Sequence, residues 1–507
     1  MEKFEPISLE EINELIPQYS DKADVIADKY KINLRKQIIE LSNEFADAYE
    51  IDSALENKDN KHQKYCLVFN PAYPVQIEFM NFVYRNGLVY FPEIYALAVT
   101  FISQYKQERL VVILERITTK SLAQHLAESR NFSVDFIKKT ILIPMYKFLS
   151  ILEKNNLSYG CINPDNIFLD SNNELIFNER FSTPPGYNQY CLFETTGRAM
   201  VEKKFLKGEA KITDDFYALG VLILVLFSGN NKFYDVDTKI IISGKLQSNS
   251  YSYVLSLLPK LEISSDINDL LIGLLMDKLS DRWGAYKLFE WIKGKQYNLM
   301  VPSDKIDSPR SINFNGTKFF NREALAYELY INWNKAKKFL RDESLIKWIE
   351  SSIGNVPLAN SIKEIKKDTF KTMSNLAFDW SDYTVCRIIA ALDPDGPLRI
   401  HHLSINLNAV GFALAYYYSN NNSDYVWLIS SIIKTELLSE IFMNRSKNRQ
   451  LEQNNRYFAW QMVFEKCIEY IKNDNCGFGI ERCIYELNPA LPCKSTMWWL
   501  KTPATGR

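Results

Sequence analysis

The fold of this chain is decided by Tyr159-Gly160-Cys161-Ile162-Asn163-Pro164-Asp165-Asn166-Ile167-Phe168-Leu169. Asn163 to Asn166 make a good turn sequence, because Asn, Pro and Asp each favour turn conformations. The apolar residues at 167–169 are typical of a short strand. The stretch therefore predicts a loop that ends in a strand.

Patterned segments flank this loop in a definite order. Upstream, Ser133 is a candidate N-cap, and apolar residues recur at helical spacing as far as Leu152. Downstream, residues 174–177 predict a second short strand, and residues 215–222 predict a buried helix. We therefore expect the loop to lie between a long helix and a strand, with a central helix further on.

These segments resemble the large lobe of the eukaryotic-type Ser/Thr protein kinases. Residues 159–169 resemble the catalytic loop, in which His-Arg-Asp precedes an apolar residue, Lys, Pro, Glu and Asn. Asp215 opens a segment similar to Asp-Val-Trp-Ser-Leu-Gly-Val, whose Asp hydrogen-bonds the loop backbone. Residues 273–283 resemble the closing segment of the lobe, whose Arg pairs with a Glu. Arg282 and Glu194 are the candidates for that pair.

The chemical positions of the loop are changed. Tyr159 stands where the family has His, Gly160 stands for Arg, Cys161 for the catalytic Asp, and Asn163 for Lys. A thiol with a pKa near about 8.5 cannot replace a carboxylate that accepts the proton of a hydroxyl. We expect Cys161 to be a small, half-buried apolar residue. Only Asn166, a metal-ligand position in the family, is unchanged.

The metal- and phosphate-binding parts are altered as well. The segment equivalent to Asp-Phe-Gly is Phe177-Asn178-Glu179-Arg180-Phe181. Asn178 or Glu179 could supply an oxygen to Mg²⁺, but Arg180 would disfavour a cation, and we expect Glu179 to be a surface residue beside Arg180. The first glycine of the chain is Gly87, so no Gly-x-Gly-x-x-Gly precedes the loop to bring backbone N–H groups close to phosphates.

The strand Lys that pairs with phosphates in the family is also missing. The strand-like residues 65–70 end in Asn70, and Lys64 precedes them. Glu78 is the candidate for the helix Glu that such a Lys would contact, and without this partner we expect an exposed acid. The resemblance therefore indicates a pseudokinase, a kinase fold without its catalytic parts.

The composition is that of a globular protein with balanced charge. Hydrophobic residues make up 47%, and the net charge of −1 gives no reason to expect nucleic acid or an anionic membrane as partner. The eight cysteines include no C-x-x-C pair, and their spacing does not fit a zinc site. No apolar signal segment follows Met1, and the apolar run at 218–227 is about half a membrane span. We expect a cytoplasmic, bacterial protein without a membrane span.

The predicted architecture is α+β, with a two-lobed kinase-like fold followed by a mostly α-helical domain. The predicted parts are an N-terminal helical extension (1–60), a small β-rich lobe (61–117) with strands at 65–69, 94–105 and 109–115, a large helical lobe (118–297), a linker (298–311) and an α-helical C-terminal domain (312–507). His401-His402 is not expected to bind metal, because adjacent residues point to different sides of a helix.

Three hypotheses for function follow. The first is a catalytically impaired pseudokinase that acts as a signalling scaffold or allosteric regulator and binds a protein partner. The second is a divergent ATP-dependent Ser/Thr kinase, or another nucleotide-dependent transferase, with Asp165, Asn166, Glu179 and Asp215 as its polar groups. The third is a helical interaction module. ATP with Mg²⁺ is the cofactor that the resemblance implies for an enzyme, and the residues alone assign no cofactor and no metal site.

Overall fold

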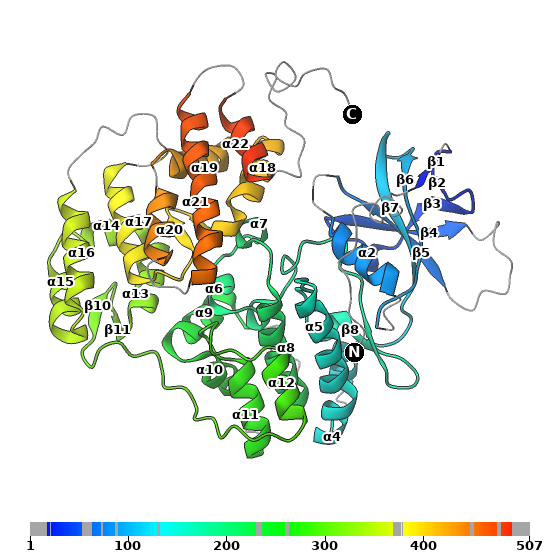
Figure 1. Ribbon diagram of the computed structural model, residues 1–507, viewed down its shortest axis with the longest axis horizontal. Helices are drawn as coiled ribbons and strands as arrows, with labels where there is room; N and C mark the ends of the chain where they lie inside the picture. Colours follow the sequence, from blue (N-terminus) through cyan, green and yellow to red (C-terminus); the bar gives the residue numbers. More distant parts are fainter. Residues whose placement is uncertain are drawn as a thin grey trace. The chain divides into compact units, whose positions relative to one another are not determined.

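The computed structural model describes residues 18–20, 22–52, 63–71, 73, 75–86, 90–128, 132–229, 236–258, 263–368, 377, 379–435, 437–446, 451–473 and 478–488. The fold is α+β, with a β-rich N-terminal sheet followed mainly by helices (Figure 1). The chain divides into two compact units. The first unit contains Met1–Gln189, Ala210–Asn231 and Gly284–Lys295, and the second contains Tyr190–Glu209, Lys232–Trp283 and Gln296–Arg507.

A seven-stranded sheet forms the N-terminal part of the first unit, in the order β1-β6-β7-β5-β4-β3-β2. Its strands are β1 (Gln18–Ser20), β2 (Val25–Ile26), β3 (Tyr30–Gln37), β4 (Ala46–Asp52), β5 (Lys64–Phe69), β6 (Ile94–Ile102) and β7 (Gln107–Glu115). Neighbouring strands are antiparallel, except that β1 runs parallel to β6. The two edge strands β1 and β2 follow each other in sequence, and β2 also lies against β6. The sheet therefore curls around an apolar cluster that includes Tyr49, Cys66 and Val111.

The strands predicted at 65–69, 94–105 and 109–115 are confirmed as β5, β6 and β7, although β6 ends at Ile102. The prediction of helices in the N-terminal extension is wrong for residues 18–52, which form four strands. Buried and exposed side chains alternate at the start of β3, but the pairing with β4 shifts register between Asn33 and Gln37. This irregularity breaks the two-residue period that identifies a strand.

Helices complete the first unit. They are α2 (Ile77–Asn86), α3 (Leu122–Ala127), α4 (Val134–Phe136), η4 (Ile137–Leu142), α5 (Ile143–Lys154), α8 (Ile212–Ser228) and α12 (Ala285–Ile292), with short η2 (Ile39–Leu41) and η5 (Pro164–Asn166) turns. The predicted N-cap is confirmed, because the hydroxyl of Ser133 accepts a hydrogen bond from the Phe136 N–H at 3.2 Å. The predicted strands form the antiparallel pair β8 (Ile167–Leu169) and β9 (Leu175–Phe177), and α8 is the predicted buried helix.

The second unit is mostly helical. Its elements are η6 (Cys191–Phe193), α6 (Thr196–Ala199), α7 (Lys204–Lys207), α9 (Thr238–Gln247), α10 (Ser250–Ser256), α11 (Ser265–Leu274), β10 (Ile312–Phe314), β11 (Thr317–Phe319), α13 (Arg322–Ile331), α14 (Trp333–Phe339), α15 (Ser344–Trp348), η8 (Ile349–Ile353), α16 (Val356–Lys367), α17 (Trp380–Leu392), β12 (Leu398–Ile400), β13 (Leu403–Ile405), η9 (Leu407–Ala409), α18 (Val410–Ser419), α19 (Ser423–Lys434), α20 (Leu437–Ser446), α21 (Leu451–Lys472) and α22 (Ile480–Leu487). One apolar core joins Met200 and Leu206 to the helices that follow residue 312. The segment 190–209 is thus built into the core of the C-terminal helices.

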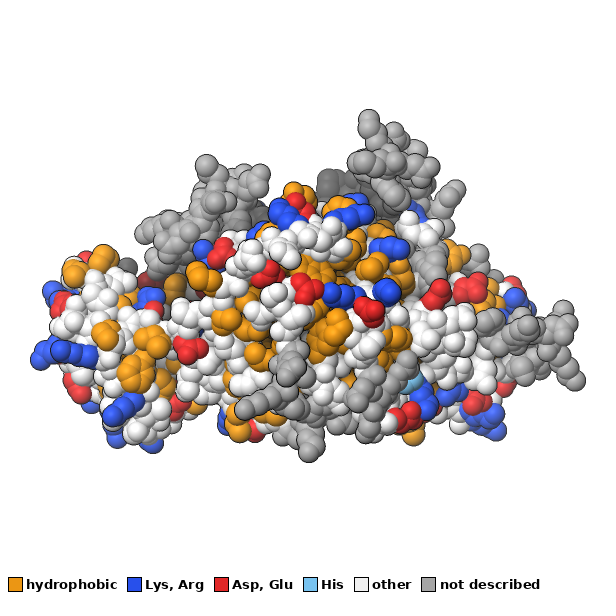
Figure 2. Space-filling model, turned by 90° about the horizontal axis from the view of Figure 1, so that it is seen from below, with side chains coloured by type: hydrophobic (Ala, Val, Ile, Leu, Met, Phe, Trp, Pro, Cys, Tyr) orange, Lys and Arg blue, Asp and Glu red, His pale blue; other side chains and the backbone are white. Residues whose placement is uncertain are grey.

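The surface reflects the balanced charge of the sequence. Basic and acidic side chains are interspersed on the face that Figure 2 shows. None of the helices in the described ranges combines the length and the apolar character that crossing a bilayer requires.

Candidate functional site

The loop at 159–166 is held in shape by a buried carboxylate at the start of α8. Asp215, which is 1% exposed, accepts hydrogen bonds from the backbone N–H groups of Tyr159 at 2.8 Å and Gly160 at 2.7 Å. Bonds from N–H groups to an ionised carboxylate are stronger than neutral ones. This is the hydrogen bonding that the resemblance implies for Asp215.

Gly160 brings a second segment of backbone against the loop. Its φ of +71° lies in the left-handed region that favours glycine. A Cβ at this position would lie 2.4 Å from the backbone nitrogen of Gly186 and 2.6 Å from the Cα of Pro185. The position of the family's Arg therefore has no room for a side chain, because residues 185–186 pack directly on the loop.

Residues 188 and 189 then cover the positions of the catalytic Asp and Lys. The Cys161 thiol donates to the Asn188 carbonyl at 3.4 Å, and the Asn163 amide donates to Oε1 of Gln189 at 2.9 Å. The amide of Gln189 returns a bond to the Ile162 carbonyl at 3.1 Å. The expectation of a half-buried Cys161 is wrong, since it is 3% exposed. Burial raises the pKa of the Cys161 thiol, so the thiol stays neutral at physiological pH.

Asn166, the unchanged metal-ligand position, is fully engaged within the protein. Its amide nitrogen donates to the Cys161 carbonyl at 3.3 Å and to Oδ1 of Asn163 at 3.0 Å. Its Oδ1, the atom that a metal would need, accepts a hydrogen bond from Nη2 of Arg180. A guanidinium therefore stands against the one ligand oxygen that the loop retains.

Glu179 is buried and bound to its own segment. Its carboxylate accepts from the Phe181 N–H at 3.0 Å and from the Ser182 hydroxyl at 3.2 Å. Burial raises the pKa of Glu179, and the neighbouring charge of Arg180 opposes this effect. Both carboxylate oxygens are used in these contacts, so the expectation of a surface Glu at this position is wrong.

Asn178 lies beside the loop through its backbone. Its N–H donates to the Asn166 carbonyl at 2.9 Å, and its carbonyl accepts from the Tyr159 hydroxyl at 3.0 Å. The structure thus brings together all three metal-ligand candidates, Asn166, Asn178 and Glu179. They do not fit a divalent cation as they stand, because the oxygens of Asn166 and Glu179 are engaged and a positive charge already lies between the two segments.

Six aromatic rings, whose contacts with one another the sequence did not predict, fix the same region. They are Phe79, Phe91, Phe148, Tyr159, Phe177 and Phe181. The Phe79 centroid lies 5.8 Å from that of Phe181 and 6.4 Å from that of Tyr159. Aromatic pairs at such distances add stability beyond their buried area. The cluster therefore locks α2, the loop and the segment after β9 to one another.

The turn between β3 and β4 occupies the place where the resemblance implies a Gly-rich loop. Residues 38–45 contain no glycine. Their neighbouring N–H groups are bound internally: Oδ1 of Asn43 accepts from the Phe45 N–H at 2.8 Å, and the Ser42 hydroxyl accepts from the Ala48 N–H at 2.9 Å. The Phe45 ring is buried, 6.4 Å from the ring of Tyr187. These N–H groups are therefore not turned toward a phosphate.

The remaining predicted positions lie apart from a phosphate-binding arrangement. The ammonium of Lys64 lies over the ring of Tyr95 at 4.2 Å. Asn70 donates from its side chain to the Glu44 carbonyl at 3.2 Å. Glu78 is exposed at the start of α2, as its sequence position without a strand Lys predicts. No Lys–Glu pair links β5 to α2 in the described part of the chain.

Glu194 forms a buried ion pair in the second unit. Nζ of Lys207 lies 2.7 Å and 2.6 Å from the two carboxylate oxygens, and both side chains are 10% exposed or less. Arg282 donates from Nε to the Met276 carbonyl at 2.9 Å. The pairing of Glu194 with Arg282 stays a prediction, and Lys207 is a partner that the sequence analysis missed.

The two histidines lie in a turn rather than in a helix. His401 and His402 connect β12 to β13, and His401 has a φ of +52°. Nε2 of His401 lies 3.1 Å from Oδ2 of Asp382. The assumption that His401 and His402 lie in a helix is therefore wrong. The described residues bring no group of three potential metal ligands together here.

Asp382 is a buried carboxylate of the second unit that accepts several hydrogen bonds. It is 3% exposed and accepts from Nε1 of Trp333 at 2.7 Å, from the Lys337 ammonium and from the Asp379 N–H at 3.0 Å. Burial acts to raise the pKa of Asp382, but hydrogen bonds from His401, Lys337 and Trp333 outweigh it and hold the pKa below its ordinary value. The arrangement stabilises α14, α17 and the β12–β13 turn.

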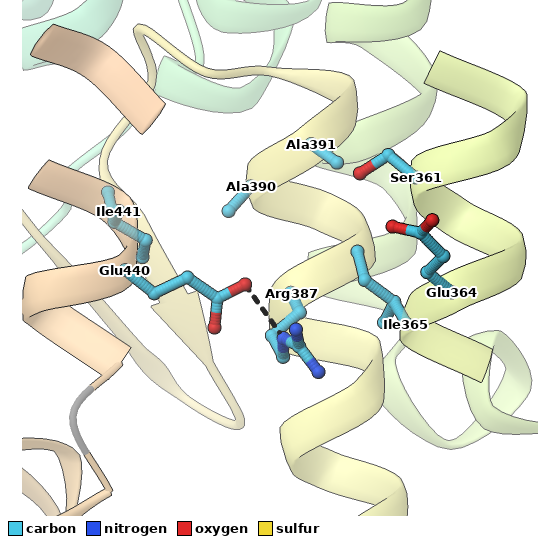
Figure 3. A pocket seen from close by; sticks show the side chains of 8 residues that line it. All are labelled: Ser361, Glu364, Ile365, Arg387, Ala390, Ala391, Glu440 and Ile441. Carbon is cyan, nitrogen blue, oxygen red and sulfur yellow. Dashed lines mark hydrogen bonds and ion pairs between the residues drawn. The ribbon is translucent and has the colours of Figure 1, made fainter. Parts of the chain in front are cut away.

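A cavity of ≈ 260 Å³ opens in the second unit among α16, α17 and α20 (Figure 3). Arg387 lines it and is neutralised by Glu440 at 2.9 Å and Asp368 at 2.6 Å. Drug-sized ligands occupy larger sites, of about 300–1,000 Å³. The cavity contains none of the residues that the sequence singled out for nucleotide or metal binding.

Comparisons with known proteins agree with the resemblance over part of the chain. No family model matches. Over 220 residues the chain is 25% identical to the cAMP-dependent protein kinase catalytic subunit of Dictyostelium discoideum. The match covers 43% of this chain and 33% of that protein, so the chain spans about a third of the relative's length. This similarity supports a protein-kinase-like domain.

Proposed function

We propose that this protein is a catalytically impaired pseudokinase, whose kinase-like domain serves a protein partner as a signalling scaffold or allosteric regulator. One observation carries the proposal. The position of the catalytic Asp is a neutral, buried thiol, Cys161, which lies beneath residues 185–189. Acid–base catalysis requires a base within about 2.6–3.2 Å of the proton that it removes. A substrate hydroxyl therefore has no base to remove its proton, and residues 185–189 block its approach to Cys161.

The phosphate side of the site supports the same proposal. Phosphoryl transfer depends on positioning and on electrostatic stabilisation of the phosphates by backbone N–H groups, Lys and metal ions. Here the N–H groups of Phe45 and Ala48 beside the β3–β4 turn are bound internally, Asn70 follows β5 where the family has Lys, and Asn166 faces Arg180. Each of the three sources of stabilisation is thus altered.

Hydrogen bonds and core packing hold residues 195–209 in place, which favours a protein-binding scaffold over an enzyme that is regulated by movement of this segment. The Ser404 hydroxyl donates to the Met200 carbonyl at 3.1 Å, and the Asn406 N–H donates to the Leu206 carbonyl at 2.9 Å. The segment shares the apolar core of the C-terminal helices. Because packed interiors do not deform continuously, such a segment rearranges only if part of the core opens.

A protein partner fits the exposed apolar side chains of the second unit. Met300 is 87% exposed and Ile306 is 64% exposed, both in the stretch between α12 and β10. Exposed apolar side chains that gather on a surface mark interaction sites more often than solitary ones do. Their presence in one short stretch supports binding of a protein.

Nucleotide binding tests the proposal. The melting temperature of the full chain is measured with ATP and ADP, each with Mg²⁺ and with Mn²⁺. A nucleotide present at about 100 times its dissociation constant would stabilise the protein by about 2.7 kcal/mol. We expect no shift, and no transfer of labelled phosphate to the chain or to a generic protein substrate. A shift that Asn166→Ala abolishes, together with phosphate transfer, would instead establish the divergent kinase.

A further inference from the structure

The cavity among α16, α17 and α20 combines a buried apolar part with acidic groups nearer the solvent. Ile365 and Ile441 line it and are each 6% exposed, whereas Glu364, which also lines it, is exposed. Figure 3 shows the carboxylates of Glu364 and Glu440 directed toward the cavity from α16 and α20, with Ala390 on the helix between them. The cavity therefore offers apolar walls to an aliphatic stem and carboxylates to a charged end.

The charges at the cavity leave an excess of negative charge. Arg387 lies 2.9 Å from Glu440 and 2.6 Å from Asp368, so two carboxylates already compensate its guanidinium. The carboxylate of Glu364 has no hydrogen-bond or ion-pair partner among the described residues. Because binding partners present complementary charge, these groups favour a cation over an anion or a neutral ligand.

The lysines of α16 do not cancel this charge, because their contacts lie elsewhere. Nζ of Lys363 contacts the Glu350 carboxylate in η8, and Nζ of Lys366 donates to the Asp342 carbonyl at 2.8 Å, before α15. Lys367 is exposed at the end of α16 and does not line the cavity. The described residues also bring no three potential metal ligands together, so a divalent ion would lack the oxygen ligands that it requires.

The size of the cavity favours a single side chain. Its volume of ≈ 260 Å³ is below the range of about 300–1,000 Å³ that is typical of drug-sized ligands. Lys and Arg bury an aliphatic stem against apolar surface and keep a charged head near water. A stem would contact Ile365, Ala390 and Ile441. The head would then reach the carboxylate of Glu364.

We propose that this cavity is an interaction site for the protein partner and receives a protruding basic side chain, Arg or Lys, of that partner. Glu364 is the residue that contacts the cationic head, and Arg387 positions Glu440 on the opposite side of the cavity. The inference rests on the proposed function and deepens it, because it names the chemistry by which the partner is recognised.

Methyl NMR spectroscopy of the full chain, labelled with carbon-13 at the Ala and Ile methyl groups, tests the proposal. The probe is N-acetyl-arginine methylamide, and N-acetyl-citrulline methylamide serves as a neutral probe of the same shape. With the arginine probe we expect saturable shifts of the Ile365, Ala390, Ala391 and Ile441 methyl signals. The expected dissociation constant is on the order of 1 mM. With the citrulline probe we expect binding about fivefold weaker, as for loss of one partly exposed ion pair.

Two matched variants locate the charge that is responsible. Glu364→Gln removes the unpaired carboxylate from an exposed position and should weaken binding of the arginine probe about fivefold. Glu343→Gln serves as the control, because Glu343 lies 3.6 Å from Lys366, is 61% exposed and does not line the cavity. For this control we expect unchanged affinity. The methyl signals distant from the cavity report whether each variant keeps the fold.

Three results would overturn the proposal: no shift of the cavity methyl signals with the arginine probe, equal affinity for the arginine and citrulline probes, or unchanged affinity in the Glu364→Gln variant. Tighter binding of putrescine, a free diamine, than of the arginine probe would overturn the assignment to a protein side chain. Each of these results leaves the proposed function intact. Transfer of phosphate from ATP would overturn the proposed function, whatever the cavity binds.

Discussion

Replacement of Asp215 by Ala should destabilise the loop at 159–166 more than any neighbouring surface change. The carboxylate accepts the N–H groups of Tyr159 and Gly160 at 2.8 Å and 2.7 Å, in a site that is 1% exposed. The substitution removes both acceptors at once. No water replaces them readily, because aromatic rings surround Tyr159.

The magnitude follows from the two stranded donors. A buried N–H group without a partner costs about 1–3 kcal/mol. Two such groups predict a loss of about 2–6 kcal/mol for Asp215→Ala. Asp215→Asn keeps one acceptor oxygen, so we expect about half of that loss. The neighbouring Asp214 accepts the Lys211 N–H at 2.9 Å as part of the cap of α8. Asp214→Ala should cost about 1 kcal/mol, typical of a lost cap.

Hydrogen exchange measures the loss of stability in the loop itself. Exchange followed by mass spectrometry gives the opening free energy of a peptide that covers 159–169, while a peptide from α16 serves as an internal reference. We expect a large loss of protection in the first peptide for Asp215→Ala, an intermediate loss for Asp215→Asn and little change for Asp214→Ala. Equal protection in the Asp215→Ala and Asp214→Ala variants would refute the assignment of Asp215 as the support of the loop.

Three further predictions concern other parts of the chain. Gly160→Ala should lower the free energy of unfolding, measured in urea, by about 3 kcal/mol or more. The left-handed backbone and the 2.4 Å approach of the Gly186 nitrogen leave no place for a Cβ. A change near zero would show that residues 185–186 move away easily. Lys207→Met should lower the free energy of unfolding by about 3–5 kcal/mol, because it removes the ammonium that pairs with the buried Glu194 carboxylate. Glu194→Leu in the same chain should recover most of this loss, and no recovery would mean that the pair is not isolated. Asp382→Asn should lower the melting temperature most near pH 7 and least near pH 3. The folded-state pKa of Asp382 lies below the unfolded value of about 3.9, so its ionised form contributes stability that is lost as the pH falls. A difference in melting temperature that does not change with pH would contradict the lowered pKa.

Much of the fold could be predicted from the sequence, because several elements carry strong local patterns. Ser133 caps the helical stretch that runs from α4 to α5, and the apolar run of α8 is buried from Ala218 to Leu226. Strand β7 contains the continuous apolar run 110–114, which its central position in the sheet explains. The N-terminal strands were missed because β3 changes register after Asn33 and because a short segment closes the sheet through pairing with β6, a long-range contact that leaves no local pattern.

The candidate site was predictable only where a motif fixed the residues. The order of motif residues placed Asp215 at the loop and identified Gly160 and Cys161 as departures. The cover formed by residues 185–189 and the hydrogen bond from Arg180 to Asn166 depend on tertiary packing, which a single sequence does not show. One signal for the hydrogen bond from Arg180 to Asn166 was present in the sequence: Arg180 lies beside Glu179 in the segment that resembles the metal-binding segment of the family.

The changes in the loop depend on one another, which explains why they occur together. Without a side chain at 160, residues 185–186 can approach the loop, and this approach brings Asn188 over Cys161. An Asp at 161 would then lie against a carbonyl oxygen in a buried site, where an unpaired carboxylate is costly. The neutral Cys161 thiol instead donates a hydrogen bond to that carbonyl. The contact between Arg180 and Asn166 follows the same reasoning, because Asn166 Oδ1 would be a buried acceptor without a donor if Arg180 did not supply one. The neutral thiol of Cys161 and the guanidinium of Arg180 thus supply the hydrogen bonds that a closely packed loop requires.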